Sequence, residues 1–234
     1  MELIAHRGAS AIAPESTRAA LAAAVSAQAD MVELDVQMTK DRRLVIFHDD
    51  RLERTSSGRG WLTHKTYAQL AKLDTGSWFA KRFSGERILL VSQLFKLLPK
   101  AVRVNLELKK TTHPQILIDR LMRIIGAMSV APRVIISSFD QKLLFPFIGS
   151  PFSYSLICSR QPQQSLRQAI RLRCQAWHLR DGLATPKLIK AAHAAGLKIR
   201  IWTVDEPRRA RQLIRWGVDG IFTNNPKKLK QVTA

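Results

Sequence analysis

Short apolar runs alternate with longer stretches of helical periodicity along this chain of 234 residues. The runs are typical of buried strands because they are brief and bounded by polar or turn residues. Eight of them are found, at Leu3–Ala5, Met31–Val36, Arg103–Leu108, Val134–Ser137, Ser153–Ile157, Ala176–Leu179, Lys198–Trp202 and Gly220–Thr223. Helical patterns lie between most of them, at Ser16–Gln28, His113–Met128, Gln164–Arg171, Pro186–Ala195 and Glu206–Trp216. This alternation predicts a parallel sheet with helical crossovers.

Eight strand-and-helix units over this length fit a (β/α)8 TIM barrel, although a doubly wound open sheet has a similar alternation. Thr185 and Pro186 are typical of a helix start, and Gly196 is typical of a left-handed helix end. Residues 50–90 fit neither pattern, because a loop-like Ser and Gly stretch is followed by mixed sequence. We therefore predict one domain, residues 1–234, with a small insertion at 50–90 after the second strand.

The chain carries a formal net charge of +20, and 46% of its residues are hydrophobic. No apolar run is long enough to cross a bilayer, and the N-terminus lacks the pattern of a signal peptide. Two cysteines do not make a disulfide framework. These features predict a cytoplasmic protein. They do not indicate an oligomeric state.

The positive charge is concentrated in the second half of the chain, where acidic residues are few. Solvated arginine-rich helix faces explain this pattern most simply. It also leaves weak association with an anionic membrane surface open as a second interaction. A nucleic-acid partner is not expected, because aromatic residues do not alternate with the basic ones as they do in single-strand binding surfaces.

Carboxylates gather near the ends of the predicted strands. Glu33 and Asp35 are two residues apart and so point to one side of their strand, and Glu107 lies near the end of the next. In a barrel these three side chains would meet at the mouth, where they repel one another unless a hard cation neutralises them. Oxygen ligands without cysteine suit Mg²⁺ or Ca²⁺. Taken alone, such a pair on a strand is more often a solvated surface feature.

Two histidines follow apolar runs in the same way, which makes a coincidence less credible. His6 ends the first strand and precedes Arg7, and His48 follows the run Val45–Phe47. Two imidazoles beside a cation and an arginine supply an acid, a base and a phosphate ligand. This combination indicates metal-assisted phosphate ester chemistry.

The ordered motifs resemble the glycerophosphodiester phosphodiesterase family over essentially the whole chain. The resemblance rests on His6-Arg7-Gly8, Pro14-Glu15-Ser16-Thr17, Glu33-Leu34-Asp35-Val36, Thr39-Lys40-Asp41, Val45-Ile46-Phe47-His48-Asp49, Asn105-Leu106-Glu107-Leu108-Lys109 and Trp202-Thr203-Val204. The stretch from Leu52 to Glu86 is similar to the small insertion of that family, and Val218–Pro226 to its last strand. The resemblance implies a TIM barrel that hydrolyses glycerophosphodiesters to sn-glycerol 3-phosphate and an alcohol, with one divalent cation.

Positions matching the family motifs imply residue roles. Glu33, Asp35 and Glu107 match the metal ligands, and His6 and His48 match the general acid and base, in an order that the sequence does not decide. The family mechanism implies attack by a glycerol hydroxyl and a cyclic phosphate that water then opens.

The same matching assigns the substrate side of the site. Arg7 matches a residue that holds the phosphate, Glu15 and Lys109 match further site positions, and Trp202 matches the wall beside the glycerol moiety. The headgroup preference does not follow from these motifs.

Three features depart from the family pattern. The stretch Ile88–Gln93 lacks a proline and two carboxylates that are common there, which leaves the substrate preference open. Ser16 replaces a common asparagine, and we expect it to cap the following helix; Asn224 replaces a common aspartate. The remaining histidines, His64, His113, His178 and His193, are expected to be non-catalytic.

Two other functions stay open. A lysophospholipase D or sphingomyelinase D-like enzyme would share the barrel and the histidine pair but act on lipid substrates. A nucleic-acid-binding barrel that has lost catalysis would lack some of these residues, whereas all of them are present.

Overall fold

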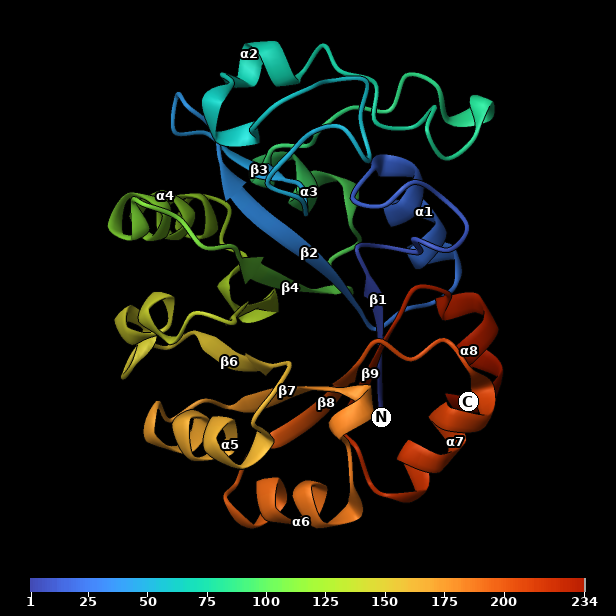
Figure 1. Cartoon of the computed structure of the whole chain (residues 1–234), viewed down its shortest axis with the longest axis vertical. Helices are drawn as coiled ribbons and strands as arrows, with labels where there is room; N and C mark the ends of the chain where they lie inside the picture. The colour runs from blue at the N-terminus through green and yellow to red at the C-terminus, as the bar shows by residue number, and fades with distance from the viewer. Residues whose placement is uncertain (234) are drawn as a thin grey trace.

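The computed structural model describes residues 1–233 and contains a closed barrel of parallel strands surrounded by helices (Figure 1). The strands are β1 (Glu2–His6), β2 (Met31–Met38), β3 (Leu44–Ile46), β4 (Arg103–Leu108), β5 (Val134–Ser138), β6 (Ser153–Cys158), β7 (Ala176–Arg180), β8 (Lys198–Trp202) and β9 (Gly220–Thr223). β1 pairs with both β2 and β9, and this double pairing closes the sheet. The expected TIM barrel is therefore confirmed, and the open sheet is wrong.

A ninth strand, β3, lies outside the closed ring. It pairs antiparallel with the end of β2, with Val36 opposite Ile46, while β2 pairs in parallel with β4. The sequence predicts eight strands, and the short run Val45–Phe47 is not among them. The structure shows that this run folds back on β2, so the segment after it starts from β3 and not directly from β2.

Eight α-helices lie in the described part of the chain. They are α1 (Arg18–Ser26), α2 (Tyr67–Leu70), α3 (Val91–Leu97), α4 (Pro114–Ala127), α5 (Pro162–Arg171), α6 (Pro186–Ala194), α7 (Pro207–Arg215) and α8 (Pro226–Thr233). Between β5 and β6 the chain forms two short 3₁₀ turns, Gln141–Leu143 and Phe145–Phe147. None of the helices among residues 1–233 is both long and apolar enough to span a bilayer.

The helix ends follow the predicted signals with one exception. The Thr185 hydroxyl accepts the backbone N–H of Leu188, and Gly196 has a φ of 75° after α6, as predicted. Ser16 does not cap α1. The Thr17 hydroxyl accepts the N–H of Ala20 instead, because Ser16 has a φ of 62° and precedes the cap position.

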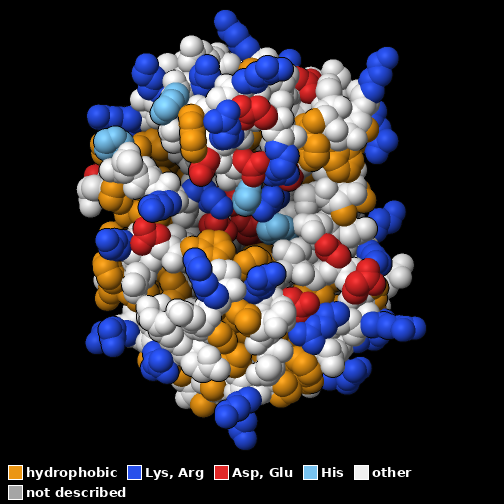
Figure 2. All heavy atoms as spheres, viewed as in Figure 1, with side chains coloured by type: hydrophobic (Ala, Val, Ile, Leu, Met, Phe, Trp, Pro, Cys, Tyr) orange, Lys and Arg blue, Asp and Glu red, His pale blue; other side chains and the backbone are white. Residues whose placement is uncertain are grey.

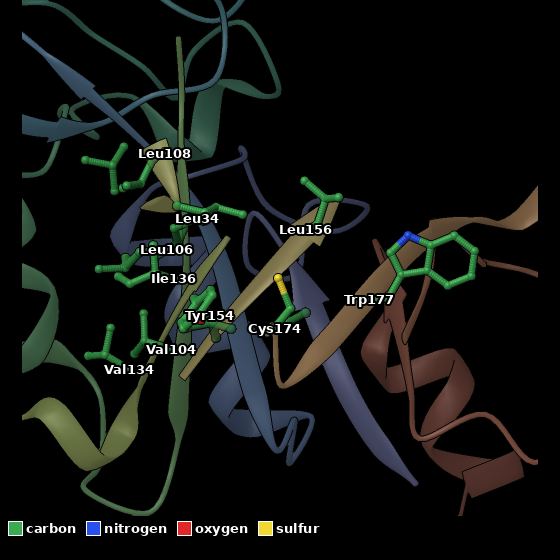
Figure 3. Packing of buried hydrophobic residues seen from close by; sticks show 14 of the residues in the cluster. Leu34, Val104, Leu106, Leu108, Val134, Ile136, Tyr154, Leu156, Cys174 and Trp177 are labelled. Atoms are coloured by element: carbon green, nitrogen blue, oxygen red, sulfur yellow. The ribbon is translucent and has the colours of Figure 1, made fainter. Parts of the chain in front are cut away.

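The main core lies between the outer face of the barrel and the helices. Outward-facing residues such as Leu34, Leu106, Ile136 and Leu156 come from successive strands and pack in one layer (Figure 3). The alternate residues point into the barrel, because side chains alternate along a strand. Packing of the outward residues thus fixes which side chains reach the barrel interior.

The segment that follows β3 has a small core of its own, in which Leu52, Leu62 and Leu70 pack against Val45 and Phe47. It lies to one side of the barrel, next to β3 and α1, at the top of Figure 1. The boundaries 50–90 and the single domain stay predictions.

Both cysteines are free and buried, as expected for core residues.

Candidate functional site

A pocket of about 100 Å³ opens at the carboxyl ends of the barrel strands. Its lining consists of His6, Arg7, Glu33, His48, Asn105, Glu107, Lys109, Phe139, Ile157, His178, Trp202 and Phe222. Figure 2 shows a hollow at the centre of this face, with acidic side chains and histidines inside it and lysines and arginines close by. The carboxyl end of a TIM barrel is where loops from many strands meet, so charged side chains far apart in sequence converge there.

Three carboxylates lie close together at the pocket. Glu33 and Asp35 point inward from β2, and Glu107 points inward from β4, where it pairs with Asp35 across the two strands. One oxygen of each carboxylate lies within 4.8 Å of the others. Glu33 Oε1 and Asp35 Oδ2 are buried without a hydrogen-bond partner. Buried carboxylate oxygens this close together, two of them without a hydrogen-bond partner, could hold a hard divalent cation.

The electrostatics of this group also fit a cation. Burial and the neighbouring carboxylates raise the pKa of Glu33 well above its usual value. Burial and Asp35 raise the pKa of Glu107 to about 7. Burial opposes ionisation of Asp35 as well, but Lys109 and His48 hold the pKa of that carboxyl below its usual value. The protein therefore stabilises one of the three charges by itself and leaves the others poorly compensated.

Two cations of the protein flank the carboxylates. Lys109 Nζ lies 2.9 Å from Glu107 Oε1 and 3.3 Å from Asp35 Oδ1. Arg7 Nε lies 3.5 Å from Asp35 Oδ2, and its Nη1 donates to Glu15 Oε1 at 3.1 Å. Glu15 thus does not line the pocket but fixes the guanidinium that does. Both cations remain at the pocket wall, where an anionic substrate group can meet them.

His6 is oriented by the loop after the last strand. Its Nδ1 lies 2.8 Å from Asn224 Oδ1, and the amide of Asn224 donates to Asp205 Oδ2 at 2.7 Å. Because the Asn224 nitrogen is engaged, its oxygen faces His6 and His6 carries its proton on Nδ1. The Nε2 atom is left to face the site, 3.8 Å from Glu33 Oε2. Burial and the Arg7 charge lower the pKa of His6 to about 4.

His48 has a charged partner instead. Its Nδ1 lies 2.5 Å from Asp49 Oδ1, and Arg54 donates to both oxygens of Asp49. Arg54 also donates to both oxygens of Glu15. The Arg54 hydrogen bond and burial act in opposite directions on Asp49, and the net effect lowers its pKa to about 2. His48 thus has an ionised carboxylate at Nδ1, whereas His6 has a neutral amide there.

Aromatic and aliphatic side chains form the other half of the pocket. The Trp202 and Phe139 rings meet edge to face at 5.6 Å, and Phe222 lies deeper in the barrel. Phe139 is 46% exposed at the rim. The pocket therefore has a charged half suited to a phosphate group and an apolar half suited to a small carbon chain.

A sequence model of the glycerophosphoryl diester phosphodiesterase family matches residues 6–228. The chain belongs to this family. It is 36% identical over 238 residues to a glycerophosphodiester phosphodiesterase of Caldanaerobacter subterraneus, a match that covers 97% of this chain and 95% of the relative. It is 30% identical over 249 residues to a Bacillus subtilis glycerophosphodiester phosphodiesterase, covering 98% of this chain and 85% of the relative.

Solved structures of glycerophosphodiester phosphodiesterases have the same fold as this chain. A phosphodiesterase from Oleispira antarctica, in complex with the product sn-glycerol-3-phosphate, has a TM-score of 0.93 at 27% identity, covering 100% of this chain and 96% of that chain. A glycerophosphodiester phosphodiesterase from Agrobacterium tumefaciens has a TM-score of 0.86 at 25% identity, covering 99% and 100%. The expected family, fold and enzyme class are thus confirmed, and the chain is a phosphodiesterase.

The residues singled out in the sequence do come together in this phosphodiesterase. All of them line the pocket except Glu15 and Asp35, each of which contacts a lining cation. Sequence reasoning missed Asp49 and Asn224 as partners of the two histidines, and Arg54 as the partner of Asp49 and Glu15. Asp49 adjoins His48 in the sequence and was the easiest to find, whereas Asn224 is 218 residues from His6.

Proposed function

We propose that this phosphodiesterase hydrolyses glycerophosphodiesters to sn-glycerol 3-phosphate and an alcohol, with one divalent cation and two histidines. The observation that carries the proposal is the cluster of Glu33, Asp35 and Glu107 at a pocket that His6 and His48 also line. Family membership supports the substrate class, and so does the product bound to the Oleispira antarctica relative.

The cation would be held by Glu33, Asp35 and Glu107, and either Mg²⁺ or Ca²⁺ suits these oxygens. When bound, it stabilises negative charge that develops on the phosphate oxygens. Arg7 and Lys109 add positive charge at the pocket wall and hold the phosphate there. Glu15 keeps the Arg7 guanidinium in place from outside the pocket.

The hydrogen-bond partners of the two histidines favour His6 as the general base and His48 as the general acid. His6 Nδ1 is bonded to a neutral amide, so its Nε2 is free to accept the proton of an attacking glycerol hydroxyl. His48 Nδ1 is hydrogen-bonded to the Asp49 carboxylate, which orients the ring, and we assign its Nε2 as the donor of a proton to the departing alcohol oxygen. The bond from phosphorus to that oxygen breaks as the new one forms. Water then opens the cyclic phosphate, with the two proton transfers reversed.

The test measures release of sn-glycerol 3-phosphate from a panel of soluble glycerophosphodiesters with Mg²⁺, Ca²⁺ or chelator. We expect chelator-sensitive turnover that falls by about 100-fold or more in His48→Ala, the loss typical of a missing acid or base. His64→Ala is the matched control, because that histidine lies outside this pocket, and it keeps full activity. Turnover that survives both chelator and His48→Ala overturns the proposal.

The same panel includes lysophosphatidylcholine, the substrate of the alternative lysophospholipase D-like activity. A pocket of about 100 Å³ has room for a glycerol phosphate but not for a buried acyl chain. We therefore expect the soluble diesters to be preferred. Cleavage of the lysolipid alone would replace the proposal with the alternative.

A further inference from the structure

His178 is a polar side chain in the apolar half of the pocket. It points inward from β7, is only 1% exposed, and its ring meets the Phe222 ring at 4.9 Å. On β7 it lies one inward-facing position below Arg180, which pairs with Trp202 on β8. The backbone oxygen of His178 accepts the Trp202 indole N–H at 3.1 Å. His178 therefore lies beneath the proposed glycerol wall, deeper than the phosphate-binding groups.

A neighbour inside the barrel fixes the tautomer of His178. Arg200 Nη1 lies 3.2 Å from His178 Nε2, and an arginine nitrogen can only donate a hydrogen bond. Nε2 must then be the acceptor, which leaves the ring proton on Nδ1. Burial and the Arg200 charge also lower the pKa of His178 well below its usual value. The ring is thus neutral, with one N–H donor at the nitrogen that does not face Arg200.

Arg200 is itself held in place from the opposite end of the barrel. Its Nε lies 2.6 Å from Glu2 Oε2, and Arg103 contacts the other oxygen of Glu2 at 3.0 Å. Gly220 leaves room for the Arg200 stem, since a Cβ there would lie 3.1 Å from Arg200 Cγ. The Arg200 side chain is only 4% exposed, and turning away would cost the buried guanidinium its ion pair with Glu2. Its direction toward His178 is therefore built into the fold.

We propose that His178 selects the substrate by donating a hydrogen bond from Nδ1 to the terminal hydroxyl of the glycerol moiety, and that Arg200 is the positioning residue that fixes the donor. This inference rests on the proposed function, which places the phosphate at the charged half of the pocket. The hydroxyl farthest from the phosphate then reaches the floor beside Trp202. There His178 is the hydrogen-bonding side chain among Ile157, Trp202 and Phe222. A substrate lacking that hydroxyl leaves a buried donor unpaired, which is how polar pockets reject such analogues.

Two conservative variants separate the two nitrogens. His178→Asn keeps a hydrogen-bonding group near the position of Nδ1 and removes the acceptor for Arg200. His178→Gln keeps an acceptor near the position of Nε2 and removes the donor. Each is assayed on a glycerol phosphodiester and on the matched propane-1,2-diol phosphodiester, which lacks only the terminal hydroxyl. A thermal unfolding measurement checks that both variants are folded.

We expect wild type to favour the glycerol substrate by about 10- to 100-fold in kcat/KM. His178→Gln should lose this preference, because its kcat/KM falls further on the glycerol substrate than on the analogue, whereas His178→Asn should retain part of the preference. A role in packing alone would lower kcat/KM for both substrates alike, and that result overturns the proposal. So does a wild type without preference. If wild type hydrolyses neither diester, the proposed function fails instead.

A measurement without turnover tests the same inference. Long-range ¹H–¹⁵N spectra of the full chain distinguish the two neutral tautomers, and the His178 signals are assigned by their loss in His178→Gln. We expect the proton on Nδ1. A proton on Nε2 or a charged ring overturns the proposal, whatever the kinetics of the variants.

Discussion

His6 and Asn224 are 218 residues apart, yet the Nδ1 atom of His6 lies 2.8 Å from the amide oxygen of Asn224. The contact joins the end of the first strand to the loop that follows the last. Asp205 accepts both the amide N–H of Asn224 and its backbone N–H, each at 2.7 Å. The tautomer of His6 is thus fixed by the closure of the barrel, because the closing strands bring these loops together.

Asn224→Ala should lower kcat by about 100-fold. Without the Asn224 oxygen, the His6 ring can rotate, and its proton can lie on either ring nitrogen. The hydroxyl of Ser10, which donates to both Asn224 Oδ1 and the His6 backbone oxygen, does not replace the lost acceptor. Asn225→Ala is the matched control. Its side chain caps α8 through Lys228, so it should lower the melting temperature and leave kcat unchanged. Equal effects of the two variants on kcat would contradict the role of Asn224.

The assignment of His48 as acid predicts a dependence on the leaving group. On a glycerol phosphodiester of an alkyl alcohol, His48→Ala should lose about 100- to 10,000-fold in kcat, because the alkoxide must depart unprotonated. On the p-nitrophenyl ester the leaving group needs no proton, so most of that loss should disappear. His6→Ala should be impaired on both esters, since each needs the attacking hydroxyl deprotonated. Rescue of His6→Ala in place of His48→Ala reverses the assignment.

The convergence of the three carboxylates could be predicted because the signals for it are local in the sequence. Glu33 and Asp35 share one side of a strand by their spacing, and the strand itself is recognisable from its apolar residues. Once the barrel closes, Glu107 must join them, because β4 pairs directly with β2. Spacing and fold class together therefore specify this part of the site.

The contacts of Arg54 and His178 could not be predicted from local sequence in this way. Arg54 comes from a loop without a periodic pattern, and its ion pair with Glu15 spans 39 positions. His178 has the sequence context of a core histidine, and its contact with Arg200 depends on the register of β7 against β8. The short β3 was missed for a related reason: three residues carry too little pattern to indicate a strand.

Glu86 attaches the segment after β3 to the barrel by capping a helix from outside. Its two oxygens accept the backbone N–H groups of Arg18 and Ala19 at the start of α1, at 3.1 and 3.2 Å. Glu86→Ala should cost about 1 kcal/mol of unfolding free energy, as loss of a helix cap does, and lower the melting temperature by about 2–4 °C. Hydrogen exchange at both amides should quicken. Glu206→Ala, an exposed control whose carboxylate pairs with Lys228, should change stability by less than about 0.5 kcal/mol.

Ser16 offers a stabilising substitution. Its φ of 62° lies in the left-handed region, where asparagine is enriched several-fold over other non-glycine residues. The Ser16 and Thr75 hydroxyls are both buried without partners and line one small cavity. Ser16→Asn should relieve the backbone strain and bring an amide toward Thr75, raising unfolding free energy by about 0.5–1 kcal/mol.

The control for this substitution is Gln28→Asn, at an exposed position with a φ of 54°. It should reproduce the backbone part of the gain without any contribution from the cavity. A larger rise in melting temperature for Ser16→Asn than for Gln28→Asn therefore measures the new hydrogen bond. A fall for Ser16→Asn alone means that the cavity is too tight for the amide, in which case overpacking outweighs the backbone gain.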